Sequence, residues 1–461
     1  MALIKSISGI RGTIGGRVGE GLSPVDTVKF AAAYGTWLKE TIHKEKLTVI
    51  IGRDARISGE MIQNLVVSTL QGLGIDVINL ELSTTPTVEV AVPMEKADGG
   101  IILTASHNPK QWNALKLLNN KGEFVSEKDG EHILKIAEKE DFTFAEVEYL
   151  GKITFDDSYI EKHIQATLDL PLVDVETVKK ARFKVVVDAV NSTGGIFIPI
   201  LLEKMGVECI KLYCEPTGHF PHNPEPLKEH LTAISKKVVE EKADLGIVVD
   251  PDVDRLALIC EDGSMFGEEY TLVAIADYVL SQTPGNTVSN MSSSRALHDI
   301  TKKYRGCFYE PSAVGEVNVV EKMKANKAVI GGEGNGGIIY PVLHYGRDSI
   351  VGIALFLTHL AKKGKSCLEL RQSYPDYYMS KNKIELTPTI DVDTVLKAVE
   401  TKFSGEEINT IDGVKIDFPE EWVHLRKSNT EPIIRIYTEA KSQERADTLA
   451  QEIMEVIKSL M

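Results

Sequence analysis

The chain's clearest capacity for chemistry lies in three aspartates at alternate positions. They are Asp250, Asp252 and Asp254, in the sequence DPDVDR that follows the apolar run Ile247–Val249. Carboxylates crowded into one tight loop repel each other unless a cation joins them, and hard oxygen ligands suit Mg²⁺ or Ca²⁺. An EF-hand is excluded because its loop glycine and distal glutamate are missing. Mg²⁺ is favoured, since it uses few carboxylates and completes its shell with phosphate oxygens. The alternative is an acidic turn without metal.

A serine stands after another apolar run. The sequence TASHNP at 104–109 follows Gly100–Leu103 and places Ser106 beside His107. A hydroxyl on a strand-to-loop turn can act as a nucleophile or a phosphoryl carrier. The alternative is a serine that only closes a turn or caps a helix. A serine-hydrolase triad fits poorly, because no GxSxG elbow surrounds Ser106.

The glycine-rich sequence GGEGNGG at 331–337 holds two polar side chains, Glu333 and Asn335. It contains a literal GxGxxG, but a dinucleotide site is disfavoured. Glu333 would stand in the pyrophosphate cradle, and Pro341 follows where a helix should begin. We instead expect Glu333 and Asn335 to hydrogen-bond ligand hydroxyls, a contact that discriminates between substrates. A glycine-rich turn without a ligand is the alternative.

Near the C-terminus, cations and hydroxyls gather around the sequence RKSNTEP at 426–432. Arginine binds phosphate through two hydrogen bonds, and hydroxyls complete such a cradle. The alternative is an edge strand with ordinary surface charges. The predicted anion site consists of Arg426, Ser428, Asn429, Thr430 and Arg435.

Two weaker signals complete the set. Arg11, in SGIRGTIG, lies among glycines that let an anion approach closely, but the sequence lacks the Gly-Lys-Ser/Thr ending of an ATP site. His219 and His222 have a metal-like spacing without a third ligand nearby, so a loop role is favoured.

The elements that position these loops repeat three times. Each round has an apolar run, a helix-like stretch, a second run, and a third run that enters a polar loop. The rounds begin near 47, 183 and 286 and end at Ser106, Arg255 and Gly337. This pattern predicts α/β layers, in which ligands bind at the carboxyl ends of strands. From about Lys383, shorter runs and two helix-like stretches predict a smaller α+β domain.

Length and composition limit the possible number of domains, the partners and the location of the protein. A chain of 461 residues implies three or four domains. A formal net charge of −15 argues against nucleic acid or an anionic membrane as partner, but not against a small anionic substrate. Five scattered cysteines without a CxxC pair indicate reduced thiols. No signal-peptide core or bilayer-length apolar run is present, so a cytoplasmic location is expected.

Together the motifs TASHNP, DPDVDR, GEGNGG and RKSNTEP resemble those of the α-D-phosphohexomutase family, over nearly the whole chain. SGIRG at 8–12 and GRDAR at 52–56 add to the likeness. The resemblance implies three similar α/β domains with mixed sheets and a C-terminal α+β domain around a central cleft. We expect domains at 1–155 for the phosphoserine, 156–257 for the metal, 258–375 for the sugar and 376–461 for the phosphate.

The resemblance also assigns roles to residues. Ser106 matches the phosphoserine, and a phosphoserine oxygen joins Asp250, Asp252 and Asp254 around Mg²⁺. Lys116 matches the proposed general acid/base, assisted by His107 and Arg11, and Arg255 lies beside the transferring phosphate. Glu333 matches a sugar contact. Arg426, Ser428, Asn429, Thr430 and Arg435 match the site of the phosphate that does not react. A hexose 1,6-bisphosphate is expected as intermediate and activator, and the enzyme as monomer or homodimer.

The chain departs from the family in two places. Ala114 follows Asn113 where members usually have glycine, and Asn335 and Gly337 replace the serine and histidine common in bacterial sugar loops. The variant sugar loop resembles that of archaeal-type phosphoglucosamine mutases. We therefore expect interconversion of glucosamine 6-phosphate and glucosamine 1-phosphate. The alternatives are a phosphoglucomutase/phosphomannomutase, a Mg²⁺ phosphatase, and a sugar-phosphate-binding homologue without turnover.

Overall fold

The computed structural model describes residues 2–6, 9–385, 391–427 and 433–460, which form two compact units. The first unit joins Met1–Thr271 to Asn335–Leu370. The second joins Leu272–Gly334 to Arg371–Met461. The chain therefore leaves the first unit, returns to it, and leaves again. Within the described part, every helix is too short or too polar to span a bilayer.

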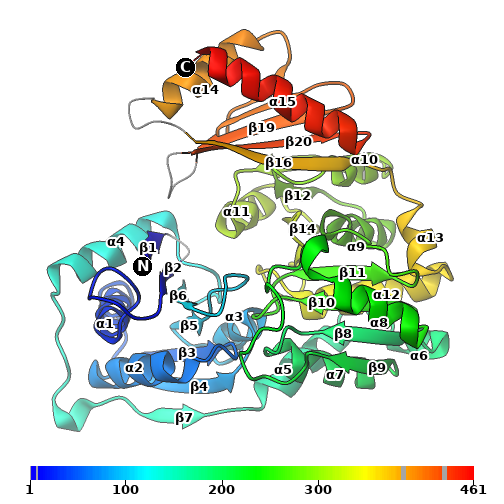
Figure 1. The fold of residues 1–461 in the computed structure, drawn as a ribbon. Helices are drawn as coiled ribbons and strands as arrows, with labels where there is room; N and C mark the ends of the chain where they lie inside the picture. Colours follow the sequence, from blue (N-terminus) through cyan, green and yellow to red (C-terminus); the bar gives the residue numbers. More distant parts are fainter. Residues whose placement is uncertain (1, 7–8, 386–390, 428–432, 461) are drawn as a thin grey trace. The chain divides into compact units, whose positions relative to one another are not determined.

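A mixed sheet with the strand order β1-β2-β6-β5-β3-β4-β7 opens the first unit (Figure 1). Strands β5, β3, β4 and β7 pair in parallel, whereas the pairs β1–β2, β2–β6 and β6–β5 are antiparallel. The strands are β1 (Leu3–Ser6), β2 (Gly9–Thr13), β3 (Thr48–Arg53), β4 (Asp76–Leu82), β5 (Gly99–Leu103), β6 (Trp112–Leu118) and β7 (Ile153–Phe155).

Helices bury both faces of this sheet. Val49 and Ile51 of β3 belong to a core shared with α1, α2 and α4, whereas Ile50 between them packs with α3 and with Tyr159 of α5. This alternation follows because successive side chains of a strand point to opposite faces. The helices are α1 (Pro24–Thr41), α2 (Gly59–Gly72), α3 (Thr85–Met94), α4 (Glu127–Lys139) and α5 (Tyr159–Leu168).

The second sheet of this unit has the order β11-β10-β8-β9, with β10 parallel to β8, β8 parallel to β9, and β11 antiparallel to β10. Helix α12, in the segment that returns to this unit, packs against α5, α6, α7 and β11. The elements are α6 (Val175–Ala181), β8 (Lys184–Asp188), α7 (Gly194–Lys204), β9 (Glu208–Leu212), α8 (Thr232–Glu241), β10 (Leu245–Val249), β11 (Leu256–Cys260), β15 (Gly337–Ile339), α12 (Ser349–Lys363) and α13 (Cys367–Arg371).

The second unit holds a parallel set in the order β13-β12-β14 and an antiparallel sheet in the order β16-β20-β19-β18-β17. Helices α14 and α15 cover one face of the antiparallel sheet (Figure 1). The elements are α9 (Glu268–Gln282), which begins in the first unit, β12 (Thr287–Asn290), α10 (Ala296–Lys302), β13 (Tyr309–Ser312), α11 (Glu316–Asn326), β14 (Ile330–Glu333), β16 (Tyr378–Glu385), α14 (Val392–Lys402), β17 (Glu407–Asn409), β18 (Val414–Asp417), β19 (Trp422–Lys427), β20 (Ile433–Ala440) and α15 (Gln443–Leu460).

The predicted threefold repeat is confirmed by strand order. In each round the first strand lies between the third and the second, as β5-β3-β4, β10-β8-β9 and β14-β12-β13, and all these pairs are parallel. The third strands end at residues 103, 249 and 333. Each predicted polar loop thus begins at the carboxyl end of a strand, at the same place in its sheet. The predicted α/β fold with a C-terminal α+β domain is also confirmed.

Candidate active site

Ser106 lies on a tight, buried loop between β5 and β6. Its side chain is 3% exposed and its φ is +48°, a left-handed conformation that non-glycine residues adopt at a cost. Thr104 stabilises the turn, because its hydroxyl accepts a hydrogen bond from the Ser106 N–H at 2.9 Å and donates to Asp54 at 2.6 Å. The Ser106 hydroxyl therefore occupies a fixed position.

Arg56 holds the backbone of the same loop. Its residue is 1% exposed, and all five guanidinium N–H groups have acceptors. Nε donates to Asp54 Oδ2 at 3.0 Å. The two Nη atoms donate to four backbone carbonyls of the loop, those of Ser106, Asn108, Pro109 and Trp112. One side chain thereby fixes the backbone on both sides of the serine.

The three aspartates lie on the connection between β10 and β11 and are fully buried. Val253, between two of them, has φ +65°, which is strained for a β-branched residue. Asp250 Oδ1 accepts hydrogen bonds from the backbone N–H groups of Asp254 and Arg255, both at 3.1 Å. The loop curls around the Asp250 carboxylate, and this curl brings all three carboxylates within reach of one ion.

One oxygen of Asp252 and one of Asp254 are bonded to neighbouring side chains. Asp252 Oδ2 accepts from Thr85 Oγ1 at 2.6 Å and from Lys116 Nζ at 2.7 Å. Asp254 Oδ2 accepts from Arg347 Nη2 at 2.7 Å. The other oxygens, Oδ1 of Asp252 and Oδ1 of Asp254, are buried and have no hydrogen-bond partner among the described residues. Buried carboxylate oxygens need such partners, and a metal ion would supply one.

The serine loop and the carboxylate loop meet. Ser106 Oγ donates to Asp250 Oδ2 at 2.7 Å. Burial raises the pKa of Asp250 well above its ordinary value, and repulsion from Asp252 and Asp254 raises it further. A bound cation would relieve this repulsion. Hard oxygen donors, two orphaned oxygens and mutual repulsion therefore fit a divalent metal ion at this loop.

Lys116 of β6 links the carboxylates, since Nζ also lies 3.4 Å from Asp254 Oδ2. Burial lowers the pKa of Lys116, but the carboxylates of Asp252 and Asp254 raise it by more, so the net direction is upward. Lys116 is thus an ammonium ion at neutral pH. The structure places it against Asp252 and Asp254.

Cationic groups surround the serine. Arg11 of β2 donates to Asn108 Oδ1 at 2.9 Å, and Arg255 Nε lies 3.9 Å from Asp254 Oδ1. His107 Nδ1 lies 3.4 Å from Ser106 Oγ. Burial lowers the pKa of His107 to about 2, and the charges of Arg255 and Arg11 contribute, so the ring is neutral. These residues form a positive environment in which an anionic group on Ser106 would be stabilised.

Sequence reasoning missed three contributors to this cluster. Arg347 follows the predicted sugar loop, and Thr85 begins α3. Arg56 is part of the motif GRDAR, but no role was predicted for it. A lone arginine or threonine carries no local signal. Arginine in GRDS, directly before a helix that Asp348 caps, is the signal that could have drawn attention to Arg347.

The predicted sugar contacts lie at the end of β14 and in the turn that follows it. Glu333 ends β14 and is 5% exposed, and its Oε1 accepts from Asn290 Nδ2 at 2.8 Å and from the Gly315 N–H at 3.3 Å. Asn335 belongs to the first unit, where its Oδ1 accepts from the Gly337 N–H at 3.2 Å. The Glu333 carboxylate is therefore held by the second unit.

The predicted phosphate site is partly described. Arg426 of β19 and Arg435 of β20 lie directly opposite each other, and Lys383 of β16 lies opposite Arg435 on its other side. Like charges in adjacent register are destabilising in the absence of an anion. The row therefore suits anion binding, although Arg426 also pairs with Asp412 at 3.2 Å. Sequence reasoning missed Lys383. Ser428, Asn429 and Thr430 lie outside the described residues.

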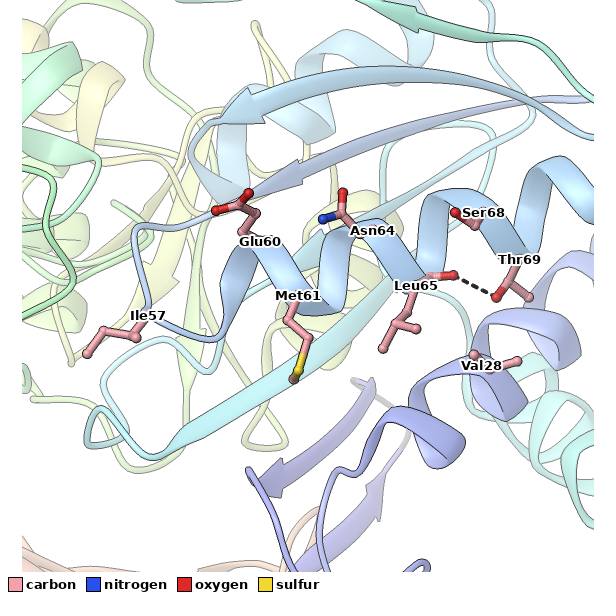
Figure 2. A pocket seen from close by; sticks show the side chains of 8 residues that line it. All are labelled: Val28, Ile57, Glu60, Met61, Asn64, Leu65, Ser68 and Thr69. Atoms are coloured by element: carbon pink, nitrogen blue, oxygen red, sulfur yellow. Dashed lines mark hydrogen bonds between the residues drawn. The ribbon is translucent and has the colours of Figure 1, made fainter.

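Two other features do not join the site. His222 bonds Asp188 Oδ2 at 3.0 Å, and His219 belongs to no group of three potential metal ligands among the described residues, so the loop role is favoured. A surface hollow of about 770 Å³ runs along α2 and touches α1 at Val28 (Figure 2). None of the predicted site residues lines it.

Sequence models of the phosphoglucomutase/phosphomannomutase family match the chain domain by domain. Alpha/beta/alpha domains I, II and III match residues 4–144, 157–263 and 267–378, and the C-terminal domain matches 383–456. The chain belongs to the α-D-phosphohexomutase superfamily and is an enzyme of the intramolecular phosphotransferase class.

Curated relatives span nearly the whole chain. A phosphoglucomutase/phosphomannomutase of Thermococcus kodakarensis is 37% identical and aligns over 94% of this chain and 95% of its own length. A probable phosphoglucosamine mutase of Methanopyrus kandleri is 31% identical over 98% and 97%. A phosphoglucosamine/phosphogalactosamine mutase of Sulfurisphaera tokodaii is 30% identical over 99% and 100%. All three names describe sugar-phosphate mutases, but they differ in the sugar.

Solved structures share the fold. A phosphoglucomutase/phosphomannomutase family protein of Burkholderia thailandensis superposes with a TM-score of 0.85 at 24% identity, over 100% of this chain and 98% of that one. An Aspergillus fumigatus N-acetylphosphoglucosamine mutase, solved in complex with GlcNAc-6P and magnesium, superposes with a TM-score of 0.57 at 15% identity, over 92% and 85%.

Proposed function

We propose that this enzyme interconverts glucosamine 6-phosphate and glucosamine 1-phosphate by way of a phosphorylated Ser106 and a glucosamine 1,6-bisphosphate. One observation carries the mechanism. A buried serine hydroxyl lies 2.7 Å from one of three clustered carboxylates, and a lysine and an arginine bind the other two. This arrangement supports phosphoryl transfer rather than acyl chemistry, since the positive groups suit a phosphate's charge.

The donor set supports Mg²⁺ as the ion, held by Asp250, Asp252, Asp254 and an oxygen of phosphoserine 106. When bound, Mg²⁺ neutralises negative charge on the transferring phosphoryl group. Oδ1 of Asp252 and Oδ1 of Asp254 are the oxygens available for it. Thr85, Lys116 and Arg347 occupy the Oδ2 atoms and so orient the carboxylates.

In the transfer step, a sugar hydroxyl attacks phosphorus, the P–O bond to Ser106 breaks, and the serine oxygen takes up a proton. Lys116, as an ammonium ion, is placed to supply that proton, and the amine so formed is placed to receive the proton that the sugar hydroxyl loses. Arg255 and Arg11 stabilise the phosphoryl charge, and the neutral His107 ring can accept a hydrogen bond from a hydroxyl group. The bisphosphate then presents its other phosphate to the serine.

Substrate binding is assigned to the second unit and the sugar loop. Glu333 and Asn335 are proposed to bind the sugar, and Arg426, Ser428, Asn429, Thr430 and Arg435 the phosphate that does not react. The row of Arg426, Arg435 and Lys383 supports an anion site. We propose domains at 1–155, 156–257, 258–375 and 376–461. We also propose that a hexose 1,6-bisphosphate activates the enzyme. The enzyme is proposed to be cytoplasmic and either monomeric or dimeric.

The names of curated relatives and the Glu333-Gly-Asn335 loop favour glucosamine phosphate over glucose or mannose phosphate. One or two polar contacts, worth about 1–3 kcal/mol, are enough to set this preference. The test is kcat/KM for the three 6-phosphates with the matching bisphosphate supplied. A tenfold higher value for glucose or mannose phosphate would show that the substrate is wrong while the mutase mechanism stands.

The same assay separates other enzyme classes. A mutase consumes one sugar phosphate and yields its isomer without free phosphate, whereas a phosphatase releases phosphate in step with substrate loss. A homologue that only binds would yield neither. The T. kodakarensis relative makes a phosphoglucomutase/phosphomannomutase the leading alternative substrate class.

A further inference from the structure

A second cluster of buried polar groups lies outside the proposed mechanism. His163 of α5, His344 and Asp348 each offer one ligand atom, and these atoms lie within 4.8 Å of one another. His163 Nε2 and His344 Nε2 lie 2.9 and 3.1 Å from the same oxygen, Asp348 Oδ2. The three side chains are 0%, 7% and 1% exposed. All belong to the first unit, and sequence reasoning did not single them out.

On each side chain, the atom on the other side from this contact faces a polar group. Thr87 Oγ1 lies 2.8 Å from His163 Nδ1, and Glu89 Oε2 lies 3.4 Å from His344 Nδ1. Asp348 Oδ1 accepts from two backbone N–H groups at the start of α12, which leaves Oδ2 facing the rings. Metal-binding histidines are oriented in this way, with the second ring nitrogen donating to a carboxylate or hydroxyl.

The acidic side chains also suit a cation. Glu89 and Asp348 bring two buried carboxyl groups to the two rings. A neutral His344 that donates from Nε2 to Asp348 would point the Nδ1 lone pair at Glu89 Oε2, which is repulsive. His344 Nδ1 indeed has no hydrogen-bond partner within the described chain. A metal on Nε2 would place the ring proton on Nδ1, where it faces Glu89.

Gly346 leaves room for the Glu89 carboxylate to approach His344. A Cβ at position 346 would lie 1.9 Å from Glu89 Oε2, so no other residue fits there without displacing the carboxylate.

We propose that His163 Nε2, His344 Nε2 and Asp348 Oδ2 bind a divalent transition-metal ion of the zinc type, at a site separate from the Asp250–Asp254 loop. Two imidazoles and one carboxylate suit Zn²⁺ and leave a fourth position for water. Tetrahedral ligands about 2.0–2.1 Å from the ion lie about 3.3 Å apart, close to the 2.9 and 3.1 Å that separate the two ring nitrogens from Asp348 Oδ2.

The bound ion would join α3, α5 and the start of α12. These elements also support the carboxylate loop, because Thr85 binds Asp252, Arg347 binds Asp254 and the Ser349 N–H donates to the Val253 carbonyl at 3.1 Å. The site therefore has a structural role, to stiffen the elements that hold the carboxylate loop. It does not depend on which sugar phosphate the enzyme uses.

The test uses the full chain, stripped of metal and held in excess Mg²⁺ so that the aspartate loop stays filled. Co²⁺ is the probe, because it replaces Zn²⁺ and shifts the NMR signals of nearby protons. We expect one equivalent of Co²⁺ per chain, displaced by Zn²⁺, and two shifted N–H signals that exchange with water, from Nδ1 of His163 and His344. His344→Gln should lose this binding, while His132→Gln, at a half-exposed ring paired with Glu40, should keep it.

The parent protein decides the outcome even if a variant fails to fold. Absence of Co²⁺ binding in excess Mg²⁺, or bound Co²⁺ without the two exchangeable signals, would overturn the proposal and leave a hydrogen-bonded cluster without metal. Unchanged Co²⁺ binding in a folded His344→Gln protein would overturn it as well. Neither result bears on the role of Ser106.

Discussion

Replacement of Arg56 by lysine tests how the serine loop is held. Arg56 makes five hydrogen bonds in a site where the residue is 1% exposed. Lysine keeps the charge but offers three donors from one nitrogen, so at least two of the five acceptors lose their partner. Each buried acceptor left unsatisfied costs about 1–3 kcal/mol, which gives a loss of roughly 2–6 kcal/mol in the free energy of local unfolding.

The activity of Arg56→Lys should fall further than its overall stability suggests. The unpaired carbonyls lie on both sides of Ser106, and a shift of about 1 Å at a reacting group costs about a hundredfold in rate. We expect kcat to drop at least about a hundredfold with a smaller change in KM, since Arg56 holds the serine rather than the sugar. Amide hydrogen exchange in residues 104–112 should quicken, and the fraction of phosphorylated Ser106 should fall.

Arg182→Lys is the matched control, because Arg182 is an exposed arginine at the end of α6. It should leave kcat, exchange and phosphorylation unchanged. If Arg56→Lys retained kcat within threefold of the parent, with normal exchange in residues 104–112, the view of Arg56 as the residue that positions Ser106 would be refuted. A uniform loss of stability across the whole first unit would point to general packing instead.

Three further predictions concern other groups. Ser106→Ala should remove the phosphorylated species seen by intact mass and lower activity by several orders of magnitude; near-normal turnover would end the phosphoserine mechanism. Chelation should abolish activity and Mg²⁺ restore it, and Asp252→Asn should weaken Mg²⁺ binding by more than about tenfold without unfolding the chain; full activity in excess chelator is the contrary result. Burial lowers the pKa of His424 to about 4, so unfolding lets the ring take up a proton below pH 6.5. Stability should therefore be complete above pH 6.5 and fall by about 3 kcal/mol as the pH approaches 4, at about 1.4 kcal/mol per pH unit. His424→Gln should flatten this part of the profile in denaturant unfolding at several pH values, and an unchanged slope would contradict the assignment.

Much of the fold was predictable because its strands are continuous apolar runs. The β10 run Leu245–Val249 is buried throughout, and such a run ending in a polar loop marks both the strand and its carboxyl end. The three loops at strand ends were found in this way. The clustering of Ser106, Lys116 and the aspartates followed from the family resemblance, and its geometry came only with the structure.

Other parts of the site could not be read from the sequence. Arg347 reaches Asp254 across 93 positions, and Arg56 reaches Ser106 across 50. Pairings of this kind depend on how helices pack around two sheets, which no local pattern encodes. His163 and His344 stand far apart in the chain, the first within α5 and the second in the turn before α12. Their meeting at Asp348 is likewise a product of tertiary structure.

The passage of the chain out of the first unit and back has a consequence for synthesis on the ribosome. Residues 272–334 are made before Arg347 and α12, although these belong to the unit that began at the N-terminus. At about 5–20 residues per second, the 93 positions from Asp254 to Arg347 take roughly 5–20 s. During this interval the nascent chain contains the three aspartates of the loop, but Arg347, the cationic partner of Asp254, has not yet been made. The first unit is therefore completed late, and a chain truncated at residue 334 would contain Ser106 and all three aspartates yet lack the segment that closes their site.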